Sequence, residues 1–317
     1  MPDHAHPPTP CGLGIDAGGT ATRWALCNGS GALLREGVAA PVSGLLLGDA
    51  AGRAQFAAVL QAIAATFVHG DGAHRASTVC AGISGFDAAQ LPLLREMAAA
   101  AFAVEPAAVA AFSDIELTCR AACAPGACAV LMAGTGSIAA CLDAEGTLQR
   151  AGGRGAVIDD AGSGHWIVRE ALRSVWRAED VRPGAWRDSP LALRLFERIG
   201  GSDWAATRAF VYGATRGEVG TLALAVAQAA ADDPAALRLL HAAGIELARL
   251  PRALAQRCGP MPLALTGRVF DLHPAVERGL LRALPASTAV HRHTEAAHIA
   301  AARLAAAQAS NSARITP

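Results

Sequence analysis

Short apolar runs that end in glycine-rich turns recur along this chain, and stretches of helical length separate them. In the first third of the chain, such runs predict strands at 11–16, 24–27, 33–38, 78–83 and 109–112. The second and third of these runs flank Asn28-Gly29, which is a strong hairpin signal. Two stretches with helical period lie between the later runs, at 49–68 and 88–102. Hairpin strands followed by alternating helices and strands predict an α/β layer with a central sheet.

The same order of elements returns near residue 129. Apolar runs at 129–132 and 138–142 flank a glycine-threonine turn, and a third strand is predicted at 147–150. The remaining elements are one strand at 262–266 and long helices at 163–177, 215–231, 234–257 and 295–307. Because the series of strand, Gly/Thr turn, strand, turn and strand occurs twice, we interpret the chain as an internal duplication.

A duplicated chain of 317 residues predicts two domains. We expect the polar residues 1–10 to form a flexible tail, residues 11–115 to form an N-terminal domain and residues 116–293 to form a C-terminal domain. The terminal helix, at about 294–308, is expected to rejoin the N-terminal domain.

The composition excludes several classes of function. Acidic and basic residues balance at 27 each and aromatic residues make up 4% of the chain, which argues against a nucleic-acid partner. The chain contains no lysine, so it can form neither a Walker A phosphate loop nor a lysine Schiff base. The longest uncharged run, 121–142, is interrupted by Pro125 and several glycines, so we expect no membrane span. Residues 1–10 lack the apolar segment of a secretory signal, and we expect a cytoplasmic protein.

Eight cysteines are scattered along the chain, and none forms a Cys-x-x-Cys motif. Cys119, Cys123 and Cys128 are the closest group, but no histidine or fourth cysteine completes a zinc set near them. We therefore expect the cysteines to be buried, reduced thiols.

The turn after the first strand has the composition of an anion-binding loop. Glycine has no Cβ, so the backbone amides of Gly18 and Gly19 could approach an anion closely. Thr20 and Thr22 add hydroxyl donors, and Asp16 could hold a cation through water. The alternative is an ordinary tight hairpin turn.

The turn at Gly134-Thr135-Gly136-Ser137 repeats this pattern at the end of another buried strand. Two such turns that open duplicated halves are consistent with a clamp that holds one polyphosphate in a cleft between the halves. A third turn contains Gly267 and could lie under a nucleotide base or ribose, or could simply end its strand.

Carboxylates mark two further positions. Asp114 ends a strand and precedes a helical run, so it could be a general base for a sugar hydroxyl or a helix cap. Asp160 follows another aspartate in a glycine-rich segment that also contains Gly153 and Arg154. Adjacent aspartates are costly to bury without hydrogen bonds, and an uncharged polyol would be a suitable partner. The alternative for this segment is a solvated loop with Ser163 as a helix cap.

Together these motifs resemble the sugar kinase, heat-shock chaperone and actin superfamily, over about residues 11–308. Within it, the chain is similar to the N-acetylglucosamine kinase and glucosamine kinase branch, which shares a family with the reductase-activating ATPases. The resemblance implies an α/β fold of two duplicated actin-like (ribonuclease H-like) domains around a nucleotide cleft, and a protein that is often a homodimer. It also implies ATP and Mg²⁺ as cofactors and an amino sugar as the small-molecule substrate.

The same resemblance implies a role for each matching residue. The first phosphate motif corresponds to 16–22, the second to 134–137 and the adenosine turn to Leu265–Gly267. Asp114 falls at the position of the catalytic aspartate, and Asp16 at that of the Mg²⁺ ligand. The substrate-side positions are Ser84, Gly153, Arg154 and Asp160, followed by Gly162 and Ser163.

Several positions depart from the branch. Ala21 stands where many relatives carry lysine, and Gly44 stands near where an asparagine often binds sugar. Ile138 replaces an asparagine, and Ala161 replaces an acidic or amide residue. Arg154 differs from the tryptophan of N-acetylglucosamine kinases and resembles the arginine of bacterial glucosamine kinases. These departures leave glucosamine, N-acetylglucosamine and N-acetylmuramic acid open as acceptors.

The implied reaction transfers the γ-phosphoryl group of ATP to the 6-hydroxyl group of an amino sugar, with Asp114 as the base. Two other functions stay open at this point. An iron–sulfur ATPase that activates a reductase would need cysteines such as Cys119, Cys123 and Cys128. A non-catalytic sugar-sensing module would need the sugar-side residues but neither phosphate turn.

Overall fold

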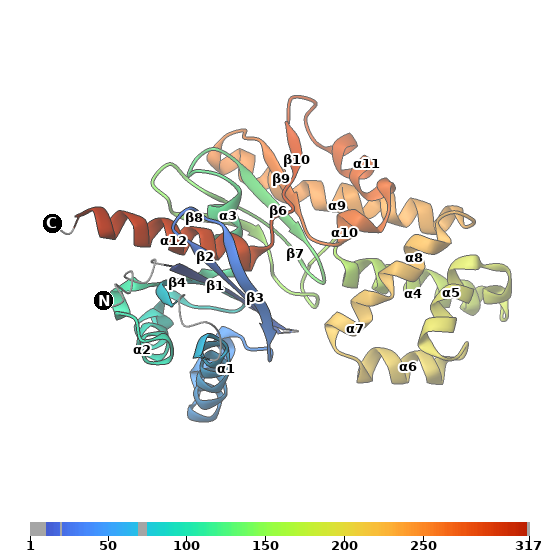
Figure 1. The fold of residues 1–317 in the computed structure, drawn as a ribbon. Coiled ribbons are helices and arrows are strands. Elements are labelled where there is room, and N and C mark those ends of the chain that lie inside the picture. Colours follow the sequence, from blue (N-terminus) through green and yellow to red (C-terminus); the bar gives the residue numbers. More distant parts are fainter. Residues whose placement is uncertain (1–10, 20, 69–74, 316–317) are drawn as a thin grey trace. The chain divides into compact units, whose positions relative to one another are not determined.

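The computed structural model describes residues 11–19, 21–68 and 75–315, with side chains up to residue 310 (Figure 1). The expected tail, residues 1–10, and Thr20 of the first phosphate turn lie outside the described residues. The chain divides into two compact units. One contains the residues up to Ala121 together with those from Thr294 onward, and the other spans residues 122–293.

The N-terminal domain is built on a five-stranded sheet with the order β3-β2-β1-β4-β5. Strands β1, β2 and β3 form antiparallel hairpins, whereas β4 and β5 run parallel to β1. Its strands are Cys11–Ala17, Thr22–Asn28, Leu33–Ala39, Ala76–Ile83 and Val109–Ser113. Its α-helices are α1 (Ala50–Val68), α2 (Leu91–Phe102), α3 (Asp114–Ala122) and α12 (Ala297–Ile315), with short 3₁₀ turns at Gly44–Gly48, Ala88–Gln90 and Pro106–Ala108.

The C-terminal domain contains a second five-stranded sheet, with the order β10-β9-β6-β7-β8. Its strands β6 to β10 are Ala129–Ala133, Ser137–Leu142, Leu148–Gly152, Leu263–Thr266 and Val290–Arg292. Number the five strands of each sheet in chain order. Starting from the edge strand of the hairpins (β3 or β8), both sheets then have the same spatial order: third, second, first, fourth and fifth strand. This shared order confirms the predicted duplication and the α/β fold class.

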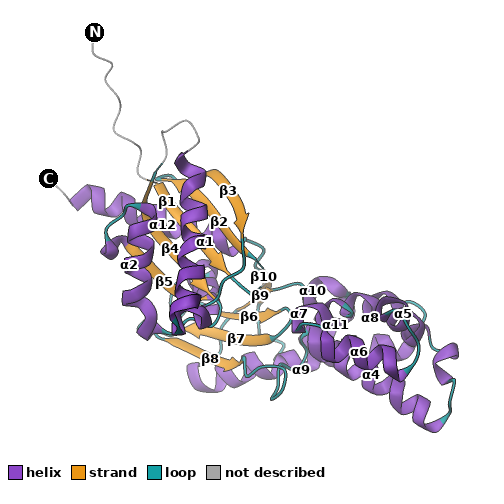
Figure 2. Cartoon of the chain, turned by 90° about the horizontal axis from the view of Figure 1, so that it is seen from below, coloured by secondary structure: helices purple, strands orange, loops and turns teal. Residues whose placement is uncertain are grey.

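Most helices of the C-terminal domain form the bundle visible in Figure 2. The α-helices of this domain are α4 (Gly164–Val181), α5 (Pro190–Ile199), α6 (Trp204–Gly213), α7 (Arg216–Thr221), α8 (Ala223–Ala229), α9 (Pro234–Cys258), α10 (Val269–Leu272) and α11 (Pro274–Ala283), with a 3₁₀ turn at Ala185–Asp188. One core contains apolar side chains of the strands and of helices α4, α5, α8, α9 and α11. Among the described helices, none is both long enough and apolar enough to cross a membrane.

The two faces of the N-terminal sheet are covered differently. On one face, Leu13 and Ile15 of β1 pack in a large apolar core with side chains of α1 and α2. On the other face, alanines of α12 pack against Ala25 and Cys80 of neighbouring strands. Gly12 and Gly14 permit this contact, because a Cβ on Gly14 would lie 2.1 Å from both the amide nitrogen of Ala302 and the carbonyl oxygen of His298.

Some sequence predictions of local structure were wrong. The predicted helix at 215–231 is two helices, α7 and α8, which meet at Leu222. Gly217 and Gly220 lie within α7 and weaken its helix propensity. Three ten-residue helices of the bundle, α5, α6 and α11, were not predicted. Strand β10 was also missed because its three residues are too few to show a period.

The prediction of reduced thiols was wrong at two of the eight cysteines. Cys123 and Cys128 form a disulfide across the turn between α3 and β6. Gly126 adopts a positive φ of 75° in this turn, which reverses the chain so that the two Cα atoms lie 6.1 Å apart. A separation of five residues gives no sequence period that would indicate this pairing.

Replacing Gly14 with alanine should lower the free energy of unfolding by about 2–4 kcal/mol, because the new Cβ must displace the backbone of α12. The measurement is urea unfolding of the purified variant. Gly48→Ala is the control, since no atom lies within 4 Å of its Cβ position. Equal stabilities of the two variants would contradict the close approach of α12 to β1.

Candidate functional site

Three neighbouring strands of the N-terminal sheet end at the same edge. Because β1, β4 and β5 are parallel, their carboxyl ends bring together Asp16, Ser84 and Asp114. The Ser84 hydroxyl donates to Oδ2 of Asp114 at 2.7 Å, and the backbone amide of Ile115 donates to Oδ1 at 2.8 Å. Both carboxylate oxygens are therefore fixed, and each keeps a further lone pair for another donor.

The backbone of Ser84 connects this carboxylate to two further segments. Its amide donates to the carbonyl oxygen of Ala17 at 2.9 Å, where the first phosphate turn begins. Its own carbonyl oxygen accepts from the amide of Gly44, also at 2.9 Å. A Cβ on Gly44 would lie 2.5 Å from the carbonyl oxygen of Gly85, so this close approach requires glycine at position 44.

Asp16 is a half-buried carboxyl group with a second carboxylate nearby. Burial raises its pKa, and the negative charge of Asp114 raises the pKa further, while His298 and Arg23 act in the opposite direction. A cation bound at this edge would relieve both unfavourable effects. The described residues contain no group of three or more metal-binding side chains. One or two carboxylates fit Mg²⁺, which keeps several waters and takes its remaining ligands from substrate phosphates.

The rest of the first phosphate turn is only partly arranged as predicted. Gly18 donates its amide to Ala21 at 3.2 Å, which closes the turn, and the Cβ position of Gly19 is open to solvent. Thr22 is fully buried, and its hydroxyl has no hydrogen-bond partner among the described residues. A phosphate could reach this hydroxyl only after the covering atoms moved.

The second phosphate turn lies between β6 and β7 and is braced by the segment that enters α4. The amide of Gly164 donates to Gly134 at 2.8 Å, and the amide of His165 donates to Thr135 at 3.4 Å. The Ser137 hydroxyl donates to the carbonyl oxygen of Ala161 at 2.9 Å, so its proton is already used within the protein. The amides of Thr135 and Gly136 have no backbone acceptor in the described part of the chain.

Asp160 packs directly against this turn. Its side chain is buried, and its Oδ2 would lie 2.8 Å from a Cβ on Gly136. The same oxygen accepts from Nη2 of Arg216 at 2.7 Å, and Oδ1 accepts from the amide of Gly155 at 3.3 Å. Asp160 adopts a positive φ of 52°, which is uncommon for a residue other than glycine.

A pocket of about 280 Å³ opens beside the second turn. Gly134 and Thr135 line one side, Gly217 and Gly220 of α7 line another, and Arg268 lies at the start of α10. Gly267 precedes that arginine with a φ of 100°, and a Cβ there would lie 2.3 Å from the carbonyl oxygen of Ala133. Glycine at 267 thus keeps the ends of β6 and β9 together at the pocket.

The remaining predicted substrate residues lie after β8. Gly153 adopts a φ of 66° and donates its amide to the carbonyl oxygen of Ser137 at 2.9 Å. The side chain of Arg154 is exposed and makes no hydrogen bond or ion pair with the described residues. Ser163 caps α4 by accepting from the amide of Trp166, as the alternative for this segment predicted.

Sequence reasoning missed several residues beside the second turn. Arg216 and Arg268 carry positive charge there, in a chain without lysine. His165 has a buried Nδ1 without a partner in the described part of the chain. Burial lowers the pKa of His165, and the positive charges of Arg216 and Arg169 lower it further, so the ring is neutral near pH 7. The only sequence signal for such arginines was the absence of lysine.

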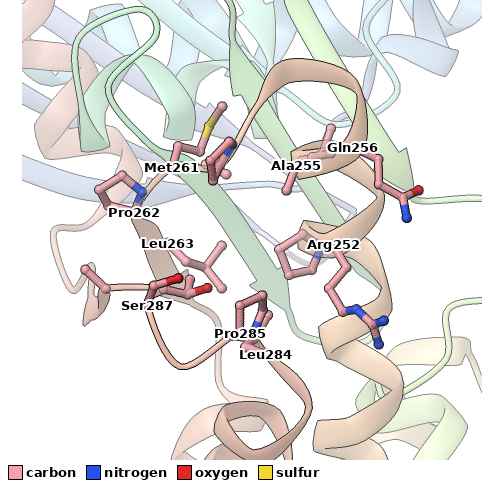
Figure 3. A pocket seen from close by; sticks show the side chains of 15 residues that line it. Arg252, Ala255, Gln256, Met261, Pro262, Leu263, Leu284, Pro285 and Ser287 are labelled. Atoms are coloured by element: carbon pink, nitrogen blue, oxygen red, sulfur yellow. The ribbon is translucent and has the colours of Figure 1, made fainter.

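A larger pocket, of about 570 Å³, lies at the opposite end of the same sheet (Figure 3). Ala129 and Leu263, where β6 and β9 begin, line it together with Pro251, Met261 and Pro285. Its lining is mainly apolar and contains no acidic residue, so it lacks the groups that phosphoryl transfer needs.

Replacing Asp16 with asparagine should raise the free energy of unfolding by about 0.5–2 kcal/mol near neutral pH. The amide removes a buried charge and its repulsion from Asp114. Because the folded-state pKa is raised, the penalty is absent below the ordinary pKa of 3.8 and complete above the raised value. The gain should therefore grow as the pH rises.

The measurement for this variant is urea unfolding at several pH values in metal-free buffer. Glu96→Gln removes an exposed carboxylate of the same domain and should leave the stability unchanged. A gain in Asp16→Asn that is equally large at pH 3 and pH 7 would show that the charge of Asp16 is not its cause.

Comparison with known proteins identifies a family and several similar structures. The sequence pattern of the BadF/BadG/BcrA/BcrD ATPase family matches residues 13–302. Among solved structures, a candidate N-acetylglucosamine kinase from Chromobacterium violaceum is 27% identical, with a TM-score of 0.69 and coverage of 96% of this chain and 100% of that one. No curated protein matches the sequence.

Two other solved structures are similar in fold alone. A candidate N-acetylglucosamine kinase from Porphyromonas gingivalis has a TM-score of 0.72 at 18% identity, over 95% of this chain and 99% of that one. A ROK family glucokinase from Streptomyces griseus, in complex with glucose and AMPPNP, has a TM-score of 0.56 at 16% identity, over 95% and 99%. Because the family pattern covers most of its length, this chain belongs to the BadF/BadG/BcrA/BcrD ATPase family.

Proposed function

We propose that the protein is an ATP-dependent sugar kinase that phosphorylates the 6-hydroxyl group of an amino sugar, N-acetylglucosamine or glucosamine. The observation that carries the proposal is the Asp114 carboxylate, which Ser84 and the amide of Ile115 hold next to Asp16. A fixed carboxylate suits a base that accepts a proton from an alcohol. Membership of an ATPase family and the similarity to the Chromobacterium violaceum protein support ATP and an amino sugar as the substrates.

In this proposal the C-terminal domain binds ATP. The 280 Å³ pocket would take the adenosine, and the amides of Thr135 and Gly136 would donate to phosphate oxygens. In the N-terminal domain, no atom lies within 4 Å of the Cβ position of Gly19, so the turn of Gly18 and Gly19 would also suit a phosphate. Ser137 would contribute through its position in the turn, since its hydroxyl donates to Ala161.

Asp114 would accept the proton of the sugar 6-hydroxyl while that oxygen bonds to the γ-phosphorus and the bond to the ADP oxygen breaks. Asp16 would hold Mg²⁺ through water, which fits its unfavourable burial beside Asp114. Bound Mg²⁺ would neutralise charge on the transferred phosphoryl group. Ser84 would position Asp114, and the segment with Gly153 and Arg154 would serve the sugar.

Purified protein with ATP and Mg²⁺ should release ADP in response to an amino sugar, because transfer requires the acceptor. The test is a coupled assay with glucosamine, N-acetylglucosamine, N-acetylmuramic acid and glucose. Asp114→Asn should lower the rate about 10²- to 10⁴-fold and still bind ATP, whereas Glu96→Gln should retain full activity. ADP release that no sugar stimulates, or an active Asp114→Asn variant, would refute the proposal.

Ser84→Ala should lower kcat about tenfold and change the KM for sugar less, because it removes one neutral hydrogen bond to the base. Steady-state kinetics with the best sugar would measure both constants. The matched control is Ser77→Ala, which removes a hydroxyl bond to the carbonyl oxygen of Cys11 near the start of β4, the strand that Ser84 follows. A raised KM with unchanged kcat would instead show that Ser84 binds the sugar directly.

A further inference from the structure

We propose that Arg216 is a phosphate-binding residue of the second turn and that Asp160 is its positioning residue. The proposal rests on the proposed function only in that the turn 134–137 receives the phosphates of ATP. It assigns a role to an arginine that no sequence motif marks. It also changes the role of Asp160 from sugar binding to the support of Arg216.

The first argument is the position of the guanidinium group. Oδ2 of Asp160 contacts Nη2 of Arg216 at 2.7 Å and would contact a Cβ on Gly136 at 2.8 Å. Because the same oxygen of Asp160 lies beside both residues, the guanidinium group lies near Gly136. The following residue, Gly217, lines the 280 Å³ pocket together with Gly134 and Thr135.

The second argument is the number of donors that Arg216 keeps for a ligand. A guanidinium carries five N–H donors in a fixed plane. Asp160 is the one acceptor that the described residues offer it, through Nη2. The Arg216 side chain is 54% exposed, whereas that of Asp160 is 4% exposed. The remaining donors of Arg216 can therefore reach a ligand, while the side chain of Asp160 is buried.

The third argument is electrostatic. A polyphosphate at the turn needs cationic partners, and this chain has no lysine to supply one. The free amides of Thr135 and Gly136 are neutral donors, and the Ser137 hydroxyl is already bonded. Burial lowers the pKa of His165, and the positive charge of Arg216 lowers it further, against the opposing charge of Asp160.

The pairing with Asp160 also explains how the arginine is held before ATP binds. A buried carboxylate without a partner is costly, so Asp160 favours a conformation in which Arg216 stays at the turn. The amide of Gly155 fixes the other carboxylate oxygen. Ordering the long side chain in advance lowers the entropy lost when a phosphate binds.

The test compares the Kd of ATP with the Kd of adenosine by isothermal titration, without sugar. Arg216→Gln should weaken ATP binding about ten- to a hundredfold, as expected for a lost hydrogen bond between charged groups, and leave adenosine binding unchanged. Arg216→Lys should recover part of the loss, because it restores the charge but not the fork of donors. Asp160→Asn should weaken ATP binding in the same direction but less, again without an effect on adenosine.

Matched controls separate this effect from a general loss of an ion pair. Arg173 forms a 2.9 Å pair with Glu170 in the same domain and is 50% exposed, so Arg173→Gln should leave both Kd values unchanged. Asp159→Asn should do the same, since the described residues give Asp159 a single hydrogen bond, from the amide of Ala161. Equal weakening of ATP and adenosine in Arg216→Gln would overturn the proposal in favour of a structural role.

An unchanged Kd of ATP in Arg216→Gln would also overturn it. The binding experiment contains no sugar, so its outcome does not depend on whether the protein is a sugar kinase. Failure of the kinase proposal can therefore be told apart from failure of the proposal for Arg216. In the first case ATP binding would still depend on Arg216, while no sugar would stimulate ADP release.

Discussion

The parallel pairing of β1, β4 and β5 determines where the chemistry of the N-terminal domain can occur. Parallel strands end at a common edge, so residues separated by about a hundred positions, Asp16 and Asp114, become neighbours there. Ser84 follows the strand between them and bonds to both segments. This arrangement depends in turn on α12, since Gly12 and Gly14 let that helix cover the opposite face of β1.

Each domain carries a carboxylate that is at least half-buried and unfavourable on its own. Asp16 lies beside a second carboxylate with its pKa raised by burial, whereas Asp160 is paired with Arg216. The difference is consistent with their proposed roles, because an uncompensated carboxylate attracts a cation and a compensated one can orient its partner. In the C-terminal domain, the second turn carries positive charge and two amides without a backbone acceptor among the described residues, whereas the strand ends of the N-terminal domain carry negative charge.

Much of the fold followed from local pattern. The hairpins of both sheets and the glycine turns after β1 and β6 were predicted from apolar runs and turn residues, and the repeated order indicated the duplication. The bundle helices α5, α6 and α11 and the strand β10 were missed, as was the pairing of Cys123 with Cys128. Short or interrupted segments such as these are stabilised by contacts with distant residues, which a window of sequence does not contain.

The sequence by itself determined the reaction class that the protein could support. Two glycine-threonine turns after buried strands and an aspartate at a strand end carry that information locally, and the absence of lysine excluded a Walker A phosphate loop. Only the tertiary structure decided which side chains act together. Asp160 and Arg216 are 56 positions apart, and no sequence motif contains both of them. Their contact exists because α7 packs against the second turn. Through-space pairing of this kind depends on the packing of whole elements, and no spacing of residues along the chain encodes it.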